Sequence, residues 1–145
     1  GIRDSSTSRG LGDVYKRQDF NNGTVAWTDW NILLNEYGGP NHVGNFCFAP
    51  VHGDTNSGEL LLTNSYYYIG HFSKFIRPGA KRVSTGTTSN RISSTSFMNQ
   101  DGSLVVIALN EEEEAVDYFL TVGDKSTQLN VPKHSIQTIV FDHLP

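Results

Sequence analysis

The second half of the chain is a series of short apolar or alternating segments, separated by residues typical of turns. These segments cover residues 82–88, 92–98, 104–109, 116–122, 128–131 and 135–141. From Val116 to Val122 every second side chain is apolar, which is typical of a strand with one buried face. Hairpin connections are indicated at 99–102 and at 123–124. About six such strands suffice for a small two-sheet module, so we predict a β-sandwich over residues 80–145.

The first half of the chain is organised differently. Residues 24–34 are mostly apolar and contain no Gly or Pro, which predicts a buried strand. Residues 35–58 are rich in Gly, Asn and Pro, and they predict a loop longer than compact domains usually tolerate without a functional reason. Residues 65–76 repeat apolar side chains at helical spacing, and Pro78 and Gly79 end the helix. Strand, loop and helix in succession are typical of one β/α unit, and α/β barrels bind ligands at the carboxyl ends of their strands.

Length and composition exclude several classes of protein. A complete α/β barrel typically needs about 250 residues, and the chain has 145. A formal charge of -4 offers no broad positive field for nucleic acid. No apolar run approaches the roughly 18 residues of a membrane span. Cys47 is the only cysteine, so a zinc site would need His and carboxylates alone. We expect no metal or cofactor, no nucleic-acid partner and no membrane span.

Residues 1–18 differ in composition from the rest. They contain four basic and almost no apolar residues, and the pattern changes at Asp19. We expect a disordered or non-native leader here, with a basic interaction arm as the alternative.

The chain shows no arrangement of catalytic groups. Retaining glycoside hydrolysis uses two carboxyl groups about 5 to 5.5 Å apart, and Asp29, Glu36 and Glu59 have no evident partners. The acidic run 111–114 is expected to be a solvated turn rather than a calcium site. We therefore predict no catalytic residue in this chain.

Aromatic and amide side chains gather around the predicted strand end and loop. A Trp exposed at a cleft can stack on the C–H face of a sugar, and Asn side chains can hydrogen-bond to hydroxyl groups. These residues indicate a possible carbohydrate cleft, although Trp27 and Trp30 fit equally well as core residues of a buried strand. The residues concerned are Trp27, Trp30, Tyr37, His42, Phe46 and Phe48, with Asn31, Asn35, Asn41 and Asn45.

Three motifs carry a family resemblance. They are WTDWNILLNEYGGPNHVGNF from Trp27 to Phe46, YIGHFSKFIRPG from Tyr68 to Gly79, and HSIQT from His134 to Thr138. In this order they closely resemble the C-terminal portion of glycoside hydrolase family 30, whose members carry a (β/α)8 barrel and a β-sandwich. The resemblance implies a mainly β chain, with a C-terminal β-sandwich (80–145) preceded by the last strand-loop-helix unit of a truncated (β/α)8 barrel (19–79).

The resemblance also implies a function. It indicates part of a retaining β-glycoside hydrolase, glucosylceramidase-like in sequence, with both catalytic Glu residues upstream and the fragment alone inactive. Trp30 and Asn45 match pocket positions, and the loop containing Asn35 and His42 shapes the entrance. The substrate expected from the resemblance is a β-glucoside, glucosylceramide or a β-glucan. Because His42 stands where glucosylceramidases usually have Trp, the chain looks more like bacterial members that act on β-glucosides or β-1,6-linked glucan. The expected partner is the remainder of its own barrel, and the location is secreted or extracytoplasmic.

Two alternatives remain at this point. The chain could be a noncatalytic carbohydrate-binding or scaffold sandwich, although residues 82–141 contain no Trp for a binding platform. Alternatively, the isolated piece does not fold, because the strand of residues 24–34 would expose apolar edges.

Overall fold

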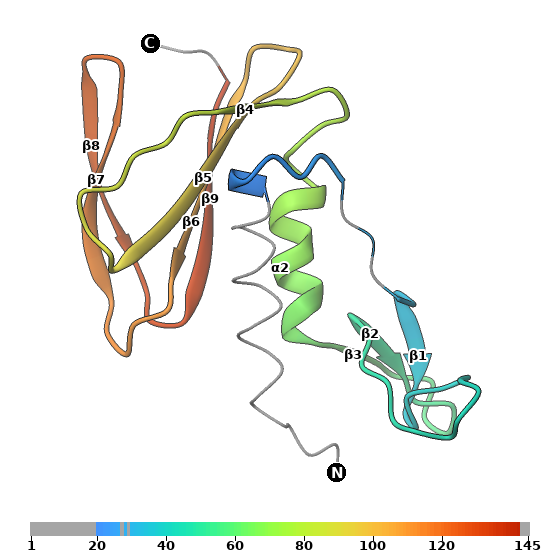
Figure 1. The fold of residues 1–145 in the computed structure, drawn as a ribbon. Helices are drawn as coiled ribbons and strands as arrows, with labels where there is room; N and C mark the ends of the chain where they lie inside the picture. Colours follow the sequence, from blue (N-terminus) through green and yellow to red (C-terminus); the bar gives the residue numbers. More distant parts are fainter. Residues whose placement is uncertain (1–19, 27, 29, 143–145) are drawn as a thin grey trace. The chain divides into compact units, whose positions relative to one another are not determined.

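The computed structural model describes residues 20–26, 28 and 30–142, and it divides into two compact units. The first is Gly1–Ile69 and the second is Gly70–Pro145. Each unit contains β-sheet, as Figure 1 shows, and the residues of α2 (Asn64–Ser73) belong partly to one unit and partly to the other. The prediction of a mainly β chain is therefore confirmed.

The first unit contains a small three-stranded sheet. Its strands are β1 (Leu33–Asn35), β2 (Val51–Gly53) and β3 (Leu60–Leu62). Strand β1 pairs with β2 in parallel, and β2 pairs with β3 in antiparallel. The register places Leu34, His52 and Leu61 side by side across the sheet. Leu34 and His52 are buried and form the inner side of this sheet.

Two predictions for the first unit are wrong in part. Of the described residues in 24–34, only Leu33 and Leu34 are in a strand. A parallel barrel strand takes its hydrogen bonds from a neighbour on each side, and no described residue of 24–31 is paired with another strand. Residues 35–58 are not entirely a loop, because the short strand β2 lies within them. Residues 1–18, Trp27 and Asp29 lie outside the described residues, so the expectations about them remain predictions.

The predicted helix forms, but no residue of α2 is fully buried. It ends at Ser73, so Phe75 and Ile76 of the predicted apolar face lie beyond it. Among the described residues, no helix combines the length and apolar character that a membrane crossing requires.

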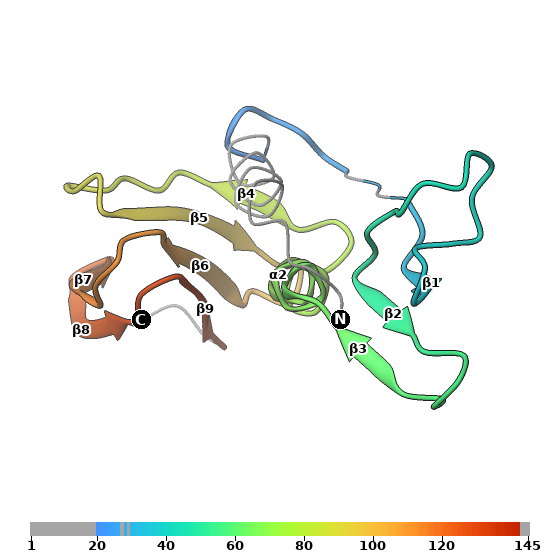
Figure 2. The ribbon, with the colours of Figure 1, turned by 90° about the horizontal axis from the view of Figure 1, so that it is seen from below.

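The second unit contains two antiparallel sheets (Figures 1 and 2). The larger has the order β4-β5-β6-β9, formed by Lys81–Val83, Ile92–Met98, Leu104–Asn110 and Ser135–Phe141. The smaller consists of β7 (Val116–Val122) and β8 (Lys125–Val131). Three strands have the predicted bounds, whereas β4 is shorter than predicted and β8 begins three residues earlier.

The core of the second unit lies between these sheets. Every residue of the central strand β6 is buried. Ile92 on β5 and Ala108 on β6 pack with Val116 and Val131 from the smaller sheet, and Tyr118 is half-buried against them. The sheets do not close along their whole length, and a groove of about 780 Å³ opens between the larger sheet and β7.

Polar side chains connect the end of the helix to the larger sheet. The Nδ1 atom of His71 lies 2.7 Å from the hydroxyl oxygen of Thr138 on β9. The side chain of Asn99, in the turn between β5 and β6, donates to the carbonyl of Phe75 and accepts from the backbone N–H of Arg77. The motif from Tyr68 to Gly79 and the HSIQT motif thus meet in the second unit.

Candidate functional site

The candidate site is a loop between β1 and β2 that is closed by its own polar groups. The Asn35 side chain accepts hydrogen bonds from the backbone N–H groups of Tyr37 (3.0 Å) and Gly39 (2.8 Å). The backbone N–H of Cys47 donates to the Gly38 carbonyl. Gly38 has a φ of 71°, and a Cβ there would collide with the backbone of Cys47, so only glycine fits this crossing. Residues 35–47 therefore form a folded loop.

Asn41 fixes the middle of this loop. Its side-chain nitrogen donates to the carbonyls of Gly38 and Asn45. The backbone of Asn45 is held in this way, whereas its side chain is exposed. The buried Oδ1 of Asn41 has no hydrogen-bond partner among the described residues.

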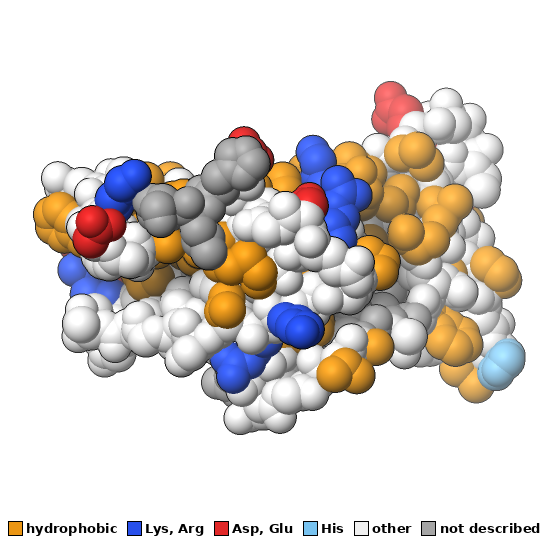
Figure 3. Space-filling view, turned by 90° about the horizontal axis from the view of Figure 1, so that it is seen from above, with side chains coloured by type: hydrophobic (Ala, Val, Ile, Leu, Met, Phe, Trp, Pro, Cys, Tyr) orange, Lys and Arg blue, Asp and Glu red, His pale blue; other side chains and the backbone are white. Residues whose placement is uncertain are grey.

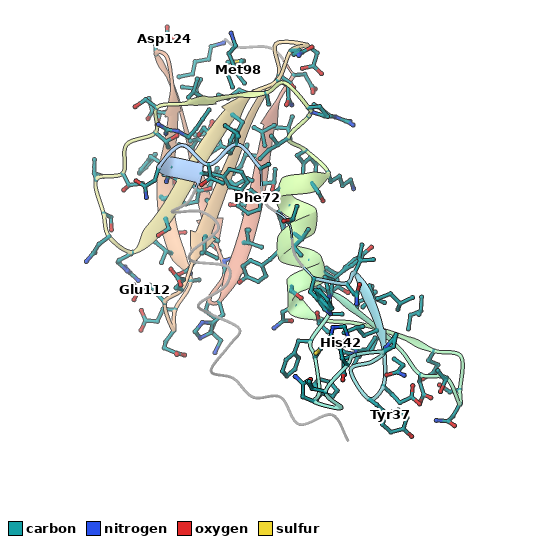
Figure 4. The ribbon with its side chains drawn as sticks, turned by 45° about the vertical axis from the view of Figure 1, so that its right-hand side comes forward. Tyr37, His42, Phe72, Met98, Glu112 and Asp124 are labelled. Carbon is teal, nitrogen blue, oxygen red and sulfur yellow. The ribbon has the colours of Figure 1, made fainter. Side chains whose placement is uncertain are left out.

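The sequence predicts four residues that contact sugar, and the structure places them in different surroundings. They are Trp30, Asn35, His42 and Asn45. Trp30 precedes the sheet and is 64% exposed. His42 and Asn45 are both exposed on the loop, and Figure 4 labels His42 and Tyr37 in this unit. The side-chain oxygen of Asn35 is already engaged within its own turn. Trp30, His42 and Asn45 thus have side chains exposed to solvent, whereas Asn35 shapes the loop.

Exposed aromatic rings follow Asn45 directly. Phe46 and Phe48 pack edge to face with ring centroids 4.9 Å apart, and both are half-exposed. Phe46 also stacks on His52 at 5.4 Å. Two members of the aromatic group expected from the sequence, Phe46 and Phe48, therefore pack together at the surface of this unit. Figure 3 shows the hydrophobic side chains exposed in one view of the molecule.

The carboxylates near the loop have structural partners. Glu36 accepts hydrogen bonds from the backbone N–H and the hydroxyl of Thr55. These bonds, the backbone bond first, hold the pKa of Glu36 below its usual value. Asp54 accepts from the backbone N–H groups of Asn56 and Ser57, which lower its pKa too. Both groups are ionised and engaged in turns, which does not suit a proton-transferring pair.

No metal centre is apparent in the part of the chain that the structure describes, where no group of three or more metal-ligating side chains gathers. The side chain of Glu113 in the acidic run instead lies 3.0 Å from His134. A hydrogen bond from His134 and its charge hold the pKa of Glu113 below its ordinary value.

The sequence analysis missed His52. This residue is 2% exposed and lies at the centre of the small sheet. Its two ring nitrogens contact Asn35 and Ala49, at the two ends of the loop. A single His in a three-residue strand carries no periodic signal, so nothing in the sequence could have indicated this role.

Family models match almost the whole chain. Residues 6–76 match the glycosyl hydrolase family 30 TIM-barrel domain, and residues 79–139 match the family 30 beta sandwich domain. The chain belongs to glycoside hydrolase family 30. The family 30 sandwich model coincides with the strands of the second unit, which confirms the predicted fold class.

Individual family 30 proteins are similar over most of this chain. Lysosomal acid glucosylceramidase of Mus musculus is 37% identical over 81% of the chain and 23% of its own length. The crystal structure of SrfJ from Salmonella typhimurium superposes with a TM-score of 0.90 at 31% identity, covering 97% of this chain and 32% of SrfJ. The endo-β1,6-glucanase BT3312 gives a TM-score of 0.77 at 28% identity, covering 84% and 28%. The chain therefore spans about a quarter of the curated relatives' length.

Proposed function

We propose that this chain is the C-terminal part of a retaining β-glycoside hydrolase that acts on β-glucosides or β-1,6-linked glucan. In this proposal Trp30 and Asn45 bind the sugar at the nonreducing end of the substrate, and His42 contacts the substrate at the pocket entrance. The two catalytic carboxyl groups belong to the upstream part of the protein. The observation on which this proposal rests is that both family 30 domain models match this chain, one after the other.

The loop geometry supports the binding role. Asn45 is held through its backbone by Asn41 and presents an exposed amide that can donate to and accept from sugar hydroxyl groups. A loop fixed before the ligand arrives loses little conformational freedom on binding. The engaged carboxylates of Glu36 and Asp54 are consistent with catalytic acids supplied from elsewhere.

The choice of substrate depends on His42 and on the names of the relatives. One relative is a glucosylceramidase and another an endo-β1,6-glucanase. An exposed His offers hydrogen bonds to a second sugar, and it offers less apolar area than Trp for a lipid. This favours a glucan or a simple β-glucoside over a ceramide-bearing substrate.

The remainder of the barrel is the proposed partner of the small sheet. Leu33 and Leu60 lie over Gly53, where an added Cβ would be 3.7 Å from each. Leu62 is opposite Val51 on the same face. These leucines are exposed in the chain alone, and exposed apolar faces of this kind mark contact surfaces. We assign this face to the upstream part of the protein.

Kinetics of the complete protein test the assignment of Trp30. Loss of a stacked aromatic contact costs about 1 kcal/mol or more, so Trp30→Ala should lower kcat/KM for an aryl β-glucoside at least about fivefold. Phe119→Ala is the matched control, because Phe119 is also an exposed aromatic but lies on β7 of the second unit.

Two results would contradict the proposal. An unchanged kcat/KM in Trp30→Ala would remove Trp30 from the binding site. Hydrolysis of the same substrate by the purified 145-residue chain would show that the reacting groups lie within it.

The alternative of a noncatalytic carbohydrate-binding module finds less support. Binding platforms usually need several exposed aromatic rings, and on the described strands of the second unit Phe119 alone is a largely exposed aromatic. Calorimetric titration with a β-glucan tests this alternative. If Phe119→Ala binds the glucan with the same affinity as the unaltered chain, Phe119 is not a binding platform and the alternative has no support.

A further inference from the structure

His52 is a buried polar residue in a sheet whose other central side chains are apolar. It pairs with Leu34 on β1 and with Leu61 on β3, and neither neighbour carries a charge. The third contact is the ring of Phe46, stacked nearly parallel at an angle of 16°. A buried polar side chain in such surroundings is costly unless each polar atom has a partner.

Both ring nitrogens of His52 have partners, and both partners are backbone groups. Nε2 accepts a hydrogen bond from the N–H of Ala49 at 3.1 Å. Nδ1 lies 2.9 Å from the carbonyl oxygen of Asn35. Because an amide N–H can only donate and a carbonyl oxygen can only accept, the ring is neutral with its proton on Nδ1.

These two bonds join the two ends of the candidate site loop. Asn35 begins the loop that contains His42 and Asn45, and Ala49 follows Phe48 just before β2. The stacked ring of Phe46 adds a third connection, directly after Asn45. One side chain therefore contacts the loop at its start, at its end and beside a proposed sugar contact.

We propose that His52 is a positioning residue that holds the loop of residues 35–49 in the conformation that binds sugar. It does not contact the substrate and acts through Asn35, Ala49 and Phe46. This inference rests on the proposed function, because it assigns the loop to sugar binding. Loss of the two bonds would free both ends of the loop and weaken substrate binding more than the chemical step.

Two variants of the complete protein separate the bonds from the space that the ring fills. In His52→Leu an apolar side chain occupies the site and makes neither hydrogen bond. In His52→Gln the amide group can donate to the Asn35 carbonyl and accept from the Ala49 N–H. Leu61→Ala is the control for sheet stability, because Leu61 is the neighbour of His52 on β3 but lies outside the loop.

Steady-state kinetics on an aryl β-glucoside give the deciding readout. We expect His52→Leu to raise KM about tenfold with kcat within about twofold, and His52→Gln to restore most of the lost affinity. Leu61→Ala should lower the melting temperature and leave KM unchanged. An unchanged KM in His52→Leu, or an equal rise of KM in Leu61→Ala, would overturn the positioning role.

Hydrogen exchange of the unaltered complete protein tests the same inference without any variant. The peptide covering residues 35–49 should be protected before sugar is added, because the loop is held in advance. Exchange as rapid as in an unfolded peptide until sugar binds would refute it. If the unaltered protein cleaves no β-glucoside, the proposed function fails. A comparison of this exchange between the unaltered protein and His52→Leu still decides whether His52 holds the loop, because faster exchange of residues 35–49 is expected only if its two bonds matter.

Discussion

Single buried amides join elements of the second unit. Asn110 is fully buried at the end of β6, and its side-chain nitrogen lies within hydrogen-bond distance of the carbonyls of Glu114, Val131 and Pro132. Its side-chain oxygen accepts from the backbone N–H of Glu112. One residue thus satisfies backbone groups at the start of the acidic turn and at the end of β8.

The replacement Asn110→Ala should therefore be strongly destabilising. It leaves carbonyl groups without partners in the interior, which costs about 2 to 3 kcal/mol of the free energy of unfolding. Urea unfolding of the complete protein measures this loss. Asn130→Ala on β8 is the control, because Asn130 is exposed and bonded only to Asp117 among the described contacts; a similar loss in both variants would contradict the special role of Asn110.

Residue type alone could not distinguish a sugar contact from a turn former. Asn35 and Asn45 carry the same amide, and the sequence analysis made both of them candidate ligands. The structure shows that the Asn35 oxygen closes its own turn, whereas the Asn45 side chain is exposed. An Asn side chain bonds to the backbone two residues onward as readily as to a ligand. Whether a given Asn closes a turn or binds a ligand therefore depends on the conformation of the folded loop.

At the scale of elements, the sequence predicted the bounds of several strands that pair with other strands of this chain. Strands β5, β7 and β9 have the predicted bounds, because their apolar residues and the turn residues on either side define them locally. The strand expected at 24–34 is much shorter than predicted, because of the described residues in this range only Leu33 and Leu34 pair with β2. Strands β2 and β3 have three residues each, too few for a period of two to be recognised.

The contact between α2 and β9 should depend on pH. Burial lowers the pKa of His71, which bonds to Thr138. The unfolded chain therefore binds more protons than the folded one just below the ordinary His pKa of about 6.5. Stability is retained above this pH and falls as the pH drops through it.

Thermal unfolding of the complete protein at pH 7.5 and pH 5.5 measures this effect. The decrease in melting temperature on acidification should be smaller in His71→Gln, which cannot take up the proton. His134→Gln is the matched control, because His134 is exposed and paired with Glu113. An undiminished decrease in His71→Gln would show that the pH dependence arises at other groups.

At the scale of the whole molecule, the exposed leucines of the small sheet should behave differently in this chain alone and in the complete protein that we propose. Leu33, Leu60 and Leu62 share one face of the sheet that β1, β2 and β3 form, and all three side chains are exposed. A short, apolar edge strand such as β3 is also a template for pairing between molecules. The isolated chain should therefore self-associate.

The double replacement Leu60→Lys and Leu62→Lys should have opposite effects in the two contexts. Light scattering should show less association of the isolated chain, because two charges interrupt the apolar face and the free edge. In the complete protein the same change should lower the free energy of unfolding by several kcal/mol if this face packs as proposed, since the charges would then be buried without partners. Phe119→Lys on β7 should change neither property greatly. If the double replacement leaves the complete protein as stable as before, this leucine face is exposed to solvent there and the proposed contact with an upstream part of the protein is wrong.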